Sequence, residues 1–280
     1  MNPRYIALRQ ILGRIGLWLS VFVIVSPAIL FFLWMASLSL KFEIDNASYP
    51  PVFFPEHIAW KNYADVFASN RFLTYFTNSL VVTGCATGLA MLVGVPAGYG
   101  IARMAAHKSA IVILIARITP GLSYLIPLFL LFQWLGLLGT LVPQIIIHLV
   151  VTVPIVIWIM IGYFASIPKE LDEAAIIDGA SWFQTLTRIF IPVALPGLIA
   201  ATIFAFTVSW AQFLYPLVFT TSTDQLVLPV GIITTLIKGD VFNWGQIMTG
   251  ALLGAAPPLI IYAFLMDYYI AGLTAGATKG

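Results

Sequence analysis

The sequence predicts an all-α membrane protein with six transmembrane helices, and three observations support that prediction. The chain of 280 residues is 61% hydrophobic and only 9% charged, whereas soluble domains carry about 25% charged residues. Its mean hydropathy is +1.00. Its apolar runs are continuous, unlike the alternating segments of about ten residues that build membrane β-barrels. A free soluble protein is therefore excluded.

Six apolar stretches are long enough to cross a bilayer, whose hydrocarbon core requires about 20 residues of helix. They cover residues 15–40, 72–102, 109–135, 142–165, 192–219 and 246–270. The first stretch follows several arginines, as a signal peptide would. It exceeds the roughly 7–15 apolar residues of a signal sequence, however, and no A-x-A cleavage site follows it. We therefore expect a retained first helix.

Basic residues in the connections predict that both termini face the cytoplasm. With that orientation, the cytoplasmic side holds Arg4, Arg9, Arg14, Arg103, Lys108, Lys169, Arg188 and Lys279. The outer side holds half as many, namely Lys41, Lys61, Arg71 and Lys238. This orientation gives outer loops at 41–71 and 220–245 and a sizeable cytoplasmic connection at 166–191.

We expect two parts in the chain: residues 1–71, with the first helix and an outer loop, and residues 72–280, with a core of five transmembrane helices. Glycines four residues apart allow close backbone contact between helices. The pairs are Gly84 and Gly88, Gly94 and Gly98, and Gly250 and Gly254. Prolines inside spans break or kink helices, and such breaks line protein or a cavity. These prolines are Pro96, Pro120, Pro127, Pro154 and Pro216.

The sequence lacks motifs for catalysis, nucleotide binding and metal binding. Without a G-x-x-x-x-G-K-[ST] loop, the chain does not hydrolyse ATP by that route, and one cysteine forms no intrachain disulfide. A net charge of +2 gives no indication of a nucleic-acid partner. The ionisable residues inside spans, Arg117, His148 and Asp267, are fewer than an ion-coupled carrier uses. We expect His148 to hydrogen-bond a neighbouring helix.

The cytoplasmic connection contains an acidic segment at residues 168–180. Pro168 suits the first turn of a helix, and Gly179 provides a stop. The helix dipole favours negative charge in the first turns, which carry Glu170, Asp172 and Glu173. One face would carry Leu171, Ala174 and Ala175. The segment therefore predicts a helix of about three turns, outside the bilayer, that fits a cleft on a cytoplasmic partner.

This segment resembles the EAA loop of the permeases of ATP-binding-cassette (ABC) importers. The resemblance rests on Glu173-Ala-Ala175, Gly179 and Ile189-Phe-Ile-Pro192, where the family pattern ends in Leu-Pro. The carbohydrate subfamily, in particular its maltose-transporter-type second permease subunit, is also similar in further segments. These are Ile167-Pro168, Asp178-Gly-Ala180, Asn78-Ser-Leu80, Gly98-Tyr-Gly-Ile-Ala-Arg103, Ile126-Pro-Leu-Phe129, Leu135-Gly-Leu137, Pro154 with Trp158, and the tail 271–280.

The resemblance implies the fold of a type I ABC importer permease and a non-catalytic subunit that forms half of a translocation pathway in an inner membrane. It implies a paralogous permease, two cytoplasmic ATPase subunits and a periplasmic or extracellular solute-binding protein as partners, besides membrane lipid. ATP and Mg²⁺ would be bound by the ATPases, with no cofactor in this chain. Coupling to the ATPases would use Glu173, Ala174, Ala175, Asp178 and Gly179. The tail residues Thr278, Lys279 and Gly280 would reach between the ATPases.

Several polar and aromatic residues are candidates for lining a substrate path. Trp210 would stack on a sugar ring and Gln212 would pair with its hydroxyls, although the family commonly has an Asn–acid pair after this tryptophan. Packing between helices explains both residues equally well. Asn78, Tyr124 and Gln133 are similar candidates.

Other functions stay open at this stage. A polyol or glycerol-3-phosphate is an alternative cargo, but an anion would favour basic groups along the path, and Arg117 is the one basic residue inside a span. From other classes, an ion-coupled secondary carrier and a membrane enzyme or assembly factor are alternatives. The sequence does not identify the sugar.

Overall fold

A computed structural model describes residues 3–69, 71–104, 106–118, 121–238 and 241–277. Within these ranges the all-α prediction is confirmed, and the strands are the two-residue pair β1 (Ile237–Lys238) and β2 (Val241–Phe242). They are antiparallel, with Ile237 opposite Phe242. The chain divides into two compact units, residues 1–70 with 235–253 and residues 71–234 with 254–280. The sequence placed a boundary after residue 71 and assigned 235–253 to the second part.

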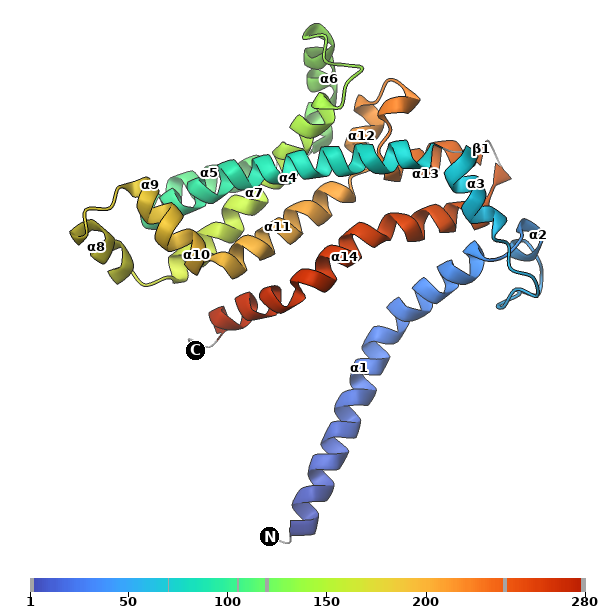
Figure 1. Ribbon diagram of the computed structural model, residues 1–280, viewed down its shortest axis with the longest axis horizontal. Helices are drawn as coiled ribbons and strands as arrows, with labels where there is room; N and C mark the ends of the chain where they lie inside the picture. The colour runs from blue at the N-terminus through green and yellow to red at the C-terminus, as the bar shows by residue number, and fades with distance from the viewer. Residues whose placement is uncertain (1–2, 70, 105, 119–120, 239–240, 278–280) are drawn as a thin grey trace. The chain divides into compact units, whose positions relative to one another are not determined.

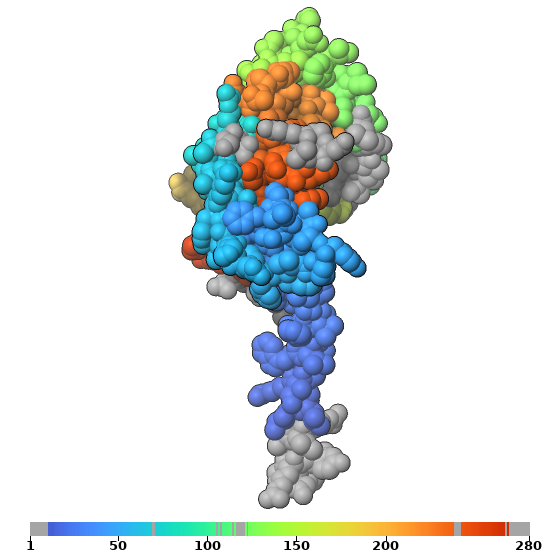
Figure 2. Space-filling view, turned by 90° about the vertical axis from the view of Figure 1, so that its right-hand side faces the viewer, coloured from blue at the N-terminus to red at the C-terminus, as the bar shows by residue number. Residues whose placement is uncertain are grey.

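The first unit begins with α1 (Pro3–Ser39), which contains the first expected span. Its segment Ile11–Ser39 is long and apolar enough to cross a membrane, and none of its most apolar window is buried by the rest of the chain. Figure 2 shows its side chains projecting along the blue helix. A helix that is apolar and uncovered in this way is suited to contact with lipid or with another subunit.

The remainder of the first unit comprises short elements joined by polar side chains. These elements are α2 (Glu43–Asn46), α3 (Lys61–Ser69), the strand pair and the beginning of α14 (Trp244–Ala277). The carboxylate of Glu43 accepts hydrogen bonds from the backbone N–H groups of Trp244 (3.1 Å) and Gly245 (2.7 Å). It therefore satisfies free donors at the N-terminus of α14. The Asn62 amide donates to the carbonyls of Ser39 and Lys41, at 2.9 Å each.

Lys41 is a buried cation in this unit, with 1% of its surface exposed. Its Nζ donates to the carbonyl oxygen of Val52 at 2.7 Å and lies 4.6 Å from the centre of the Trp34 ring. Burial lowers the pKa of Lys41, while the nearby negative charge of Asp45 opposes that change.

The second unit is built around three helices that pack side by side, α4 (Phe72–Arg103), α7 (Val142–Ser166) and α11 (Leu195–Trp210) (Figure 1). A Cβ at Gly94 would lie 2.6 Å from Cγ1 of Val156, and one at Gly98 would lie 2.7 Å from Cβ of Met160. The close contact predicted for this glycine pair is confirmed. A Cβ at Gly88, by contrast, would meet open space.

Buried polar side chains connect α7 to the helices beside it. Nδ1 of His148 lies 2.8 Å from Oγ of Ser209 on α11, which confirms the hydrogen bond expected for this histidine. One turn earlier on α7, the Gln144 amide donates to Oγ1 of Thr220, which follows α12 (Leu214–Phe219), and to the carbonyl of Gln225, at 3.0 Å each.

Not every expected span is one helix. Residues 109–135 are divided among α5 (His107–Ile118), the 3₁₀ turn η1 (Gly121–Tyr124) and α6 (Leu125–Trp134). Among the described residues, four helices are long and apolar enough to span a membrane, and a pair bent by 82° gives a fifth. The count of six stays a prediction.

The remaining elements of the second unit connect these helices. They are α8 (Glu170–Ile177), α9 (Trp182–Gln184), the π-helix η2 (Thr185–Phe190), α10 (Ile191–Val193), η3 (Thr223–Gln225) and most of α13 (Leu228–Leu236). The span expected at 192–219 is interrupted after Trp210, because three residues separate the end of α11 from the start of α12.

Candidate functional site

The acidic segment at 168–180 forms the helix α8, as expected, but the helix is shorter than predicted. It has eight residues, begins two positions after Pro168 and ends at Ile177. Gly179 adopts a left-handed conformation with φ of +73°. Its N–H donates to the carbonyl of Ile176 at 3.0 Å, and the N–H of Ala180 donates to the carbonyl of Ala175 at 2.9 Å. This is a Schellman motif, which satisfies carbonyls at the end of the helix.

The predicted small face of α8 is divided between the interior and the surface. Ala175 is buried, and Leu171 packs against the apolar core of the second unit. In this conformation the chain itself covers the Ala175 side chain, so a contact of Ala175 with a partner stays a prediction. Ala174, Glu173 and the turn at residues 178–179 are exposed.

Large apolar side chains beside this turn are exposed, and sequence reasoning missed them. Ile177 is 85% exposed, and Ile176 is nearly as open. Trp182 and Phe183, which follow the turn, are also exposed. Two consecutive isoleucines at the end of an otherwise acidic helix were the available signal, because adjacent helical residues point about 100° apart and a narrow buried face does not cover both.

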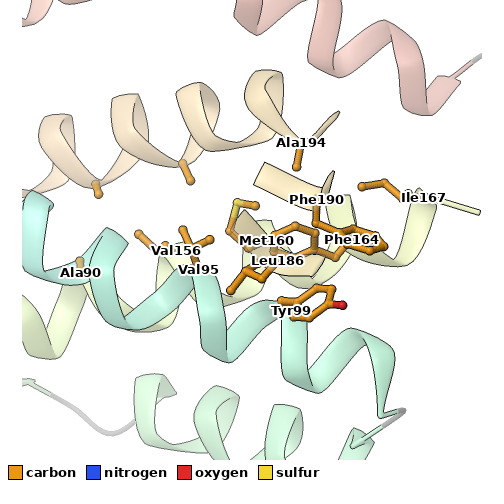
Figure 3. Packing of buried hydrophobic residues seen from close by; sticks show 12 residues of the cluster. Ala90, Val95, Tyr99, Val156, Met160, Phe164, Ile167, Leu186, Phe190 and Ala194 are labelled. Atoms are coloured by element: carbon orange, nitrogen blue, oxygen red, sulfur yellow. The ribbon is translucent and has the colours of Figure 1, made fainter. Parts of the chain in front are cut away.

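The inward side of α8 is attached to the end of α4. Oδ2 of Asp172 lies 3.1 Å from Nε of Arg103, and Oδ1 accepts a hydrogen bond from the Tyr99 hydroxyl at 3.1 Å. The Tyr99 ring contacts Phe190 and Phe164, with ring centres 4.9 and 5.4 Å away. Figure 3 shows these rings together, with the Tyr99 hydroxyl at the edge of the cluster.

A capped turn and a π-helix lead from α8 into α11. Oγ of Ser181 accepts from the Gln184 N–H at 3.3 Å, and Oε1 of Gln184 accepts from the Ser181 N–H at 2.8 Å, which completes a capping box. The π-helix η2 follows, and the chain then bends by 82° into α11. π-Helical turns are rare and occur frequently at functional sites.

Comparison with known proteins identifies the family of this chain. Residues 90–274 match the family described as the binding-protein-dependent transport system inner membrane component. The chain belongs to this family. The permease of the diacetylchitobiose uptake system of Streptomyces coelicolor, DasC, is 31% identical over 97% of this chain and 99% of its own length. The trehalose/maltose permease MalG of Thermococcus litoralis is 29% identical over 98% of each chain.

A solved structure supports the fold. A chain of a bacterial ABC transporter involved in the import of the acidic polysaccharide alginate matches with a TM-score of 0.74 and 20% identity, over 96% of this chain and 99% of that one. The predicted importer-permease fold is confirmed. As a member of a family of inner-membrane transport components, the chain is a permease subunit and not an enzyme.

Three of the five candidate path residues have structural partners in this permease. The Trp210 indole is buried and donates to the carbonyl of Gly254 at 2.9 Å. The Asn78 amide donates to the carbonyls of Asp224 and Leu226, at 2.8 and 2.9 Å. The Tyr124 hydroxyl lies 3.3 Å from that of Tyr215. Packing therefore accounts for each of these three in the conformation described.

The other two candidates lie at the ends of helices. Gln212 is half-buried and follows the last residue of α11, and Gln133 is exposed in the last turn of α6. The predicted tail residues Thr278, Lys279 and Gly280 lie outside the described residues, as does the side chain of Arg117.

Proposed function

We propose that this chain forms half of the translocation pathway of an ATP-driven sugar importer and that α8 is the segment on which the ATPase subunits act. Its partners are a paralogous permease, two ATPases and a solute-binding protein, and ATP and Mg²⁺ are bound by the ATPases. The family supports the dependence on a binding protein. Relatives named for diacetylchitobiose and for trehalose and maltose support a sugar as cargo.

The proposed role of α8 rests on the difference between its two faces, one packed against the permease and one exposed. Its inner face is fixed to the permease by Leu171, Asp172 and Ala175, while Ile176, Ile177 and the loop at 178–179 remain exposed. Exposed large apolar side chains beside acidic ones are what a transient protein partner covers. We name residues 173, 174 and 176–179 the docking surface.

The test is an affinity purification of the tagged chain from native membranes, with the co-eluting proteins identified. We expect an ATPase with nucleotide-binding motifs and a second permease. Ile177→Asp places an unpaired charge in the docking surface and should reduce the recovered ATPase by about tenfold or more, the effect of losing roughly 1.4 kcal/mol of binding.

The matched control is Ile44→Asp, because Ile44 is 80% exposed and belongs to the other unit. It should leave the amount of ATPase unchanged. Recovery of the chain alone, or equal ATPase with both variants, would overturn the proposal. In that case, uptake that survives ATP depletion and collapses with the ion gradient would identify a secondary carrier.

We also propose that both termini and α8 lie in the cytoplasm. The free Cys85 is exposed, so the labelling experiment starts from Cys85→Ser. A membrane-impermeant thiol reagent applied outside intact cells should modify Tyr49→Cys and should not modify Ile177→Cys. The opposite pattern would reverse the topology.

Deleting residues 273–280 should abolish coupled ATPase activity if the tail reaches between the ATPases.

The cargo is identified with the co-purified binding protein, screened against neutral mono- and oligosaccharides, polyols and glycerol-3-phosphate. We expect a neutral sugar. For this chain, Gln212 and Gln133 are the residues we propose for the path, because neither lies in the buried core. Binding of glycerol-3-phosphate alone would overturn the sugar assignment without affecting the role of α8.

A further inference from the structure

The acidic residues of the first turn of α8 have different surroundings. Glu170 and Glu173 are exposed, whereas the Asp172 side chain is only 23% exposed and faces α4. It accepts the Tyr99 hydroxyl and lies beside the Arg103 guanidinium. A helix dipole acts on all three carboxylates, so it does not explain why one of them is turned inward.

Arg103 contacts three separate segments of the chain. Besides Asp172 on α8, its Nη1 donates at 3.1 Å to the carbonyl of Ile167, which caps the end of α7. Its guanidinium carbon lies 4.5 Å from the centre of the Phe190 ring, at the end of the π-helix η2. The residue therefore joins its own helix α4 to the end of α7, to α8 and to η2.

The aromatic cluster beneath this arginine limits how these segments can shift. Tyr99, one turn earlier on α4, contacts Phe164 of α7, Phe190 of η2 and also Trp182 of α9, whose ring centre is 5.4 Å away. Phe164 and Phe190 are fully buried. Because protein interiors are close-packed and transmit strain, a displacement of α8 cannot be absorbed locally at this point.

The guanidinium suits this arrangement better than another cation would. It is planar, carries several donors in fixed directions and stacks on aromatic faces, whereas a lysine ammonium is a point charge on a flexible chain. A buried ion pair contributes little net stability compared with apolar packing. The arrangement is therefore better explained by the single orientation that it imposes on α8 than by stability.

We propose that Arg103 is a positioning residue that attaches α8 to α4, so that a displacement of α8 moves the end of α4 and, through Phe190, the π-helix that precedes α11. This inference rests on the proposed function of α8 as the segment on which the ATPases act. Asp172 attaches α8 to α4, while the docking surface contacts the ATPase.

The experiment uses the complete transporter, with both permeases and the ATPases in lipid nanodiscs, assayed for ATP hydrolysis with and without the co-purified binding protein. Arg103→Lys keeps the charge but loses the planar fork. We expect normal recovery of ATPase subunits and a ratio of stimulated to basal hydrolysis reduced about tenfold, the size expected for losing a charge-assisted hydrogen bond. Asp172→Asn should have the same effect.

Two controls make the result specific. Arg188→Lys is the same substitution at an exposed arginine of η2 and should leave the ratio unchanged. The double variant Arg103→Lys, Asp172→Asn should lose no more than either single variant, because residues that act through one contact are not additive.

Each alternative result overturns a different claim. A normal ratio in both single variants would show that the attachment is not used in coupling. Loss of the ATPase subunits, or a parallel fall in basal and stimulated hydrolysis, would show that Arg103 serves assembly or folding instead. If Ile177→Asp leaves the ATPases bound, the proposed function of α8 fails, and this inference fails with it.

Discussion

Each unit of this permease buries a cation over an aromatic ring, yet the two cations have different surroundings. Lys41 lies 4.6 Å from the Trp34 ring and donates to a carbonyl eleven residues away. Arg103 lies 4.5 Å from the Phe190 ring and donates to a carbonyl 64 residues away. Lys41 is 1% exposed, whereas the Arg103 side chain is 11% exposed and has Asp172 as a counter-ion.

The difference shows what each cation does. Lys41 closes one local loop, and its positive charge carries a desolvation cost that its carbonyl acceptor and the Trp34 ring offset in part. Arg103 organises segments that meet only in the folded chain. We therefore expect replacement by an apolar side chain of similar length to cost much more stability at Arg103 than at Lys41.

The largest expected effect is that of Arg103→Met. It leaves Asp172 without its counter-ion and the Ile167 carbonyl without its donor. We therefore expect a loss of about 2–3 kcal/mol in the free energy of unfolding, below the roughly 3–5 kcal/mol of a fully buried pair because Asp172 is partly exposed. Lys41→Met removes a costly buried charge and one hydrogen bond, and should change stability by less than about 1 kcal/mol. Denaturant unfolding in detergent measures both. Equal losses would contradict the contrast drawn between the two cations.

The second effect tests the long-range packing that supports Arg103. Gly98→Ala places a Cβ 2.7 Å from Cβ of Met160 and 3.2 Å from the Ile157 carbonyl oxygen. We expect a loss of about 1–3 kcal/mol from overpacking between α4 and α7. Gly88→Ala meets open space and should be neutral or slightly stabilising, because alanine favours a helix more than glycine does. Thermal unfolding that is the same for both would show that the helices separate easily.

The third effect is confined to one turn and is smaller. Ser181→Ala removes the acceptor of the Gln184 N–H in the capping box before η2. We expect a loss of about 1 kcal/mol, as for other N-cap residues. Hydrogen exchange should increase at residues 182–185 and stay unchanged in α7. Faster exchange throughout the second unit would indicate that this cap supports more than its own turn.

The sequence predicted the structural features that depend on residues close together along the chain. Gly179 and the acidic first turn predicted α8, because a left-handed glycine and a helix dipole act within a few residues. Gly94 and Gly98 predicted a close helix contact, although only the fold shows that Val156 and Met160 are the residues in contact. The family resemblance was recognisable because its motif residues lie in order along the chain.

The missed features depend on segments far apart in the sequence. Arg103 entered the sequence argument only as a cytoplasmic charge and as part of a motif, since nothing local indicates that α8 and η2 meet it. The burial of Ala175 beside an exposed Ala174 was not predicted, because the periodicity of an eight-residue helix does not show which face the core covers. The π-helix requires a shift of hydrogen-bond register that no residue in 185–190 signals by itself.

Lys41 also makes the stability of the folded chain depend on pH. Burial lowers the pKa of Lys41 in the folded chain below its ordinary value of 10.5. Between the lowered pKa and 10.5, the unfolded chain binds more protons than the folded chain, so this group makes the free energy of unfolding rise with pH. Below that window both states are protonated, and the destabilising contribution is constant.

Lys41→Met should therefore remove the increase in the free energy of unfolding with pH that Lys41 causes. The difference in stability between Lys41→Met and the wild-type chain, measured by unfolding at a series of pH values up to 10.5, should shift in favour of the wild type as pH increases. Asp45→Asn removes the charge that opposes the shift and should lower the pKa of Lys41 further, which extends the rise to lower pH. A difference that does not change with pH would show that the Lys41 ammonium is as well stabilised in the fold as in water, and that its burial carries no net cost.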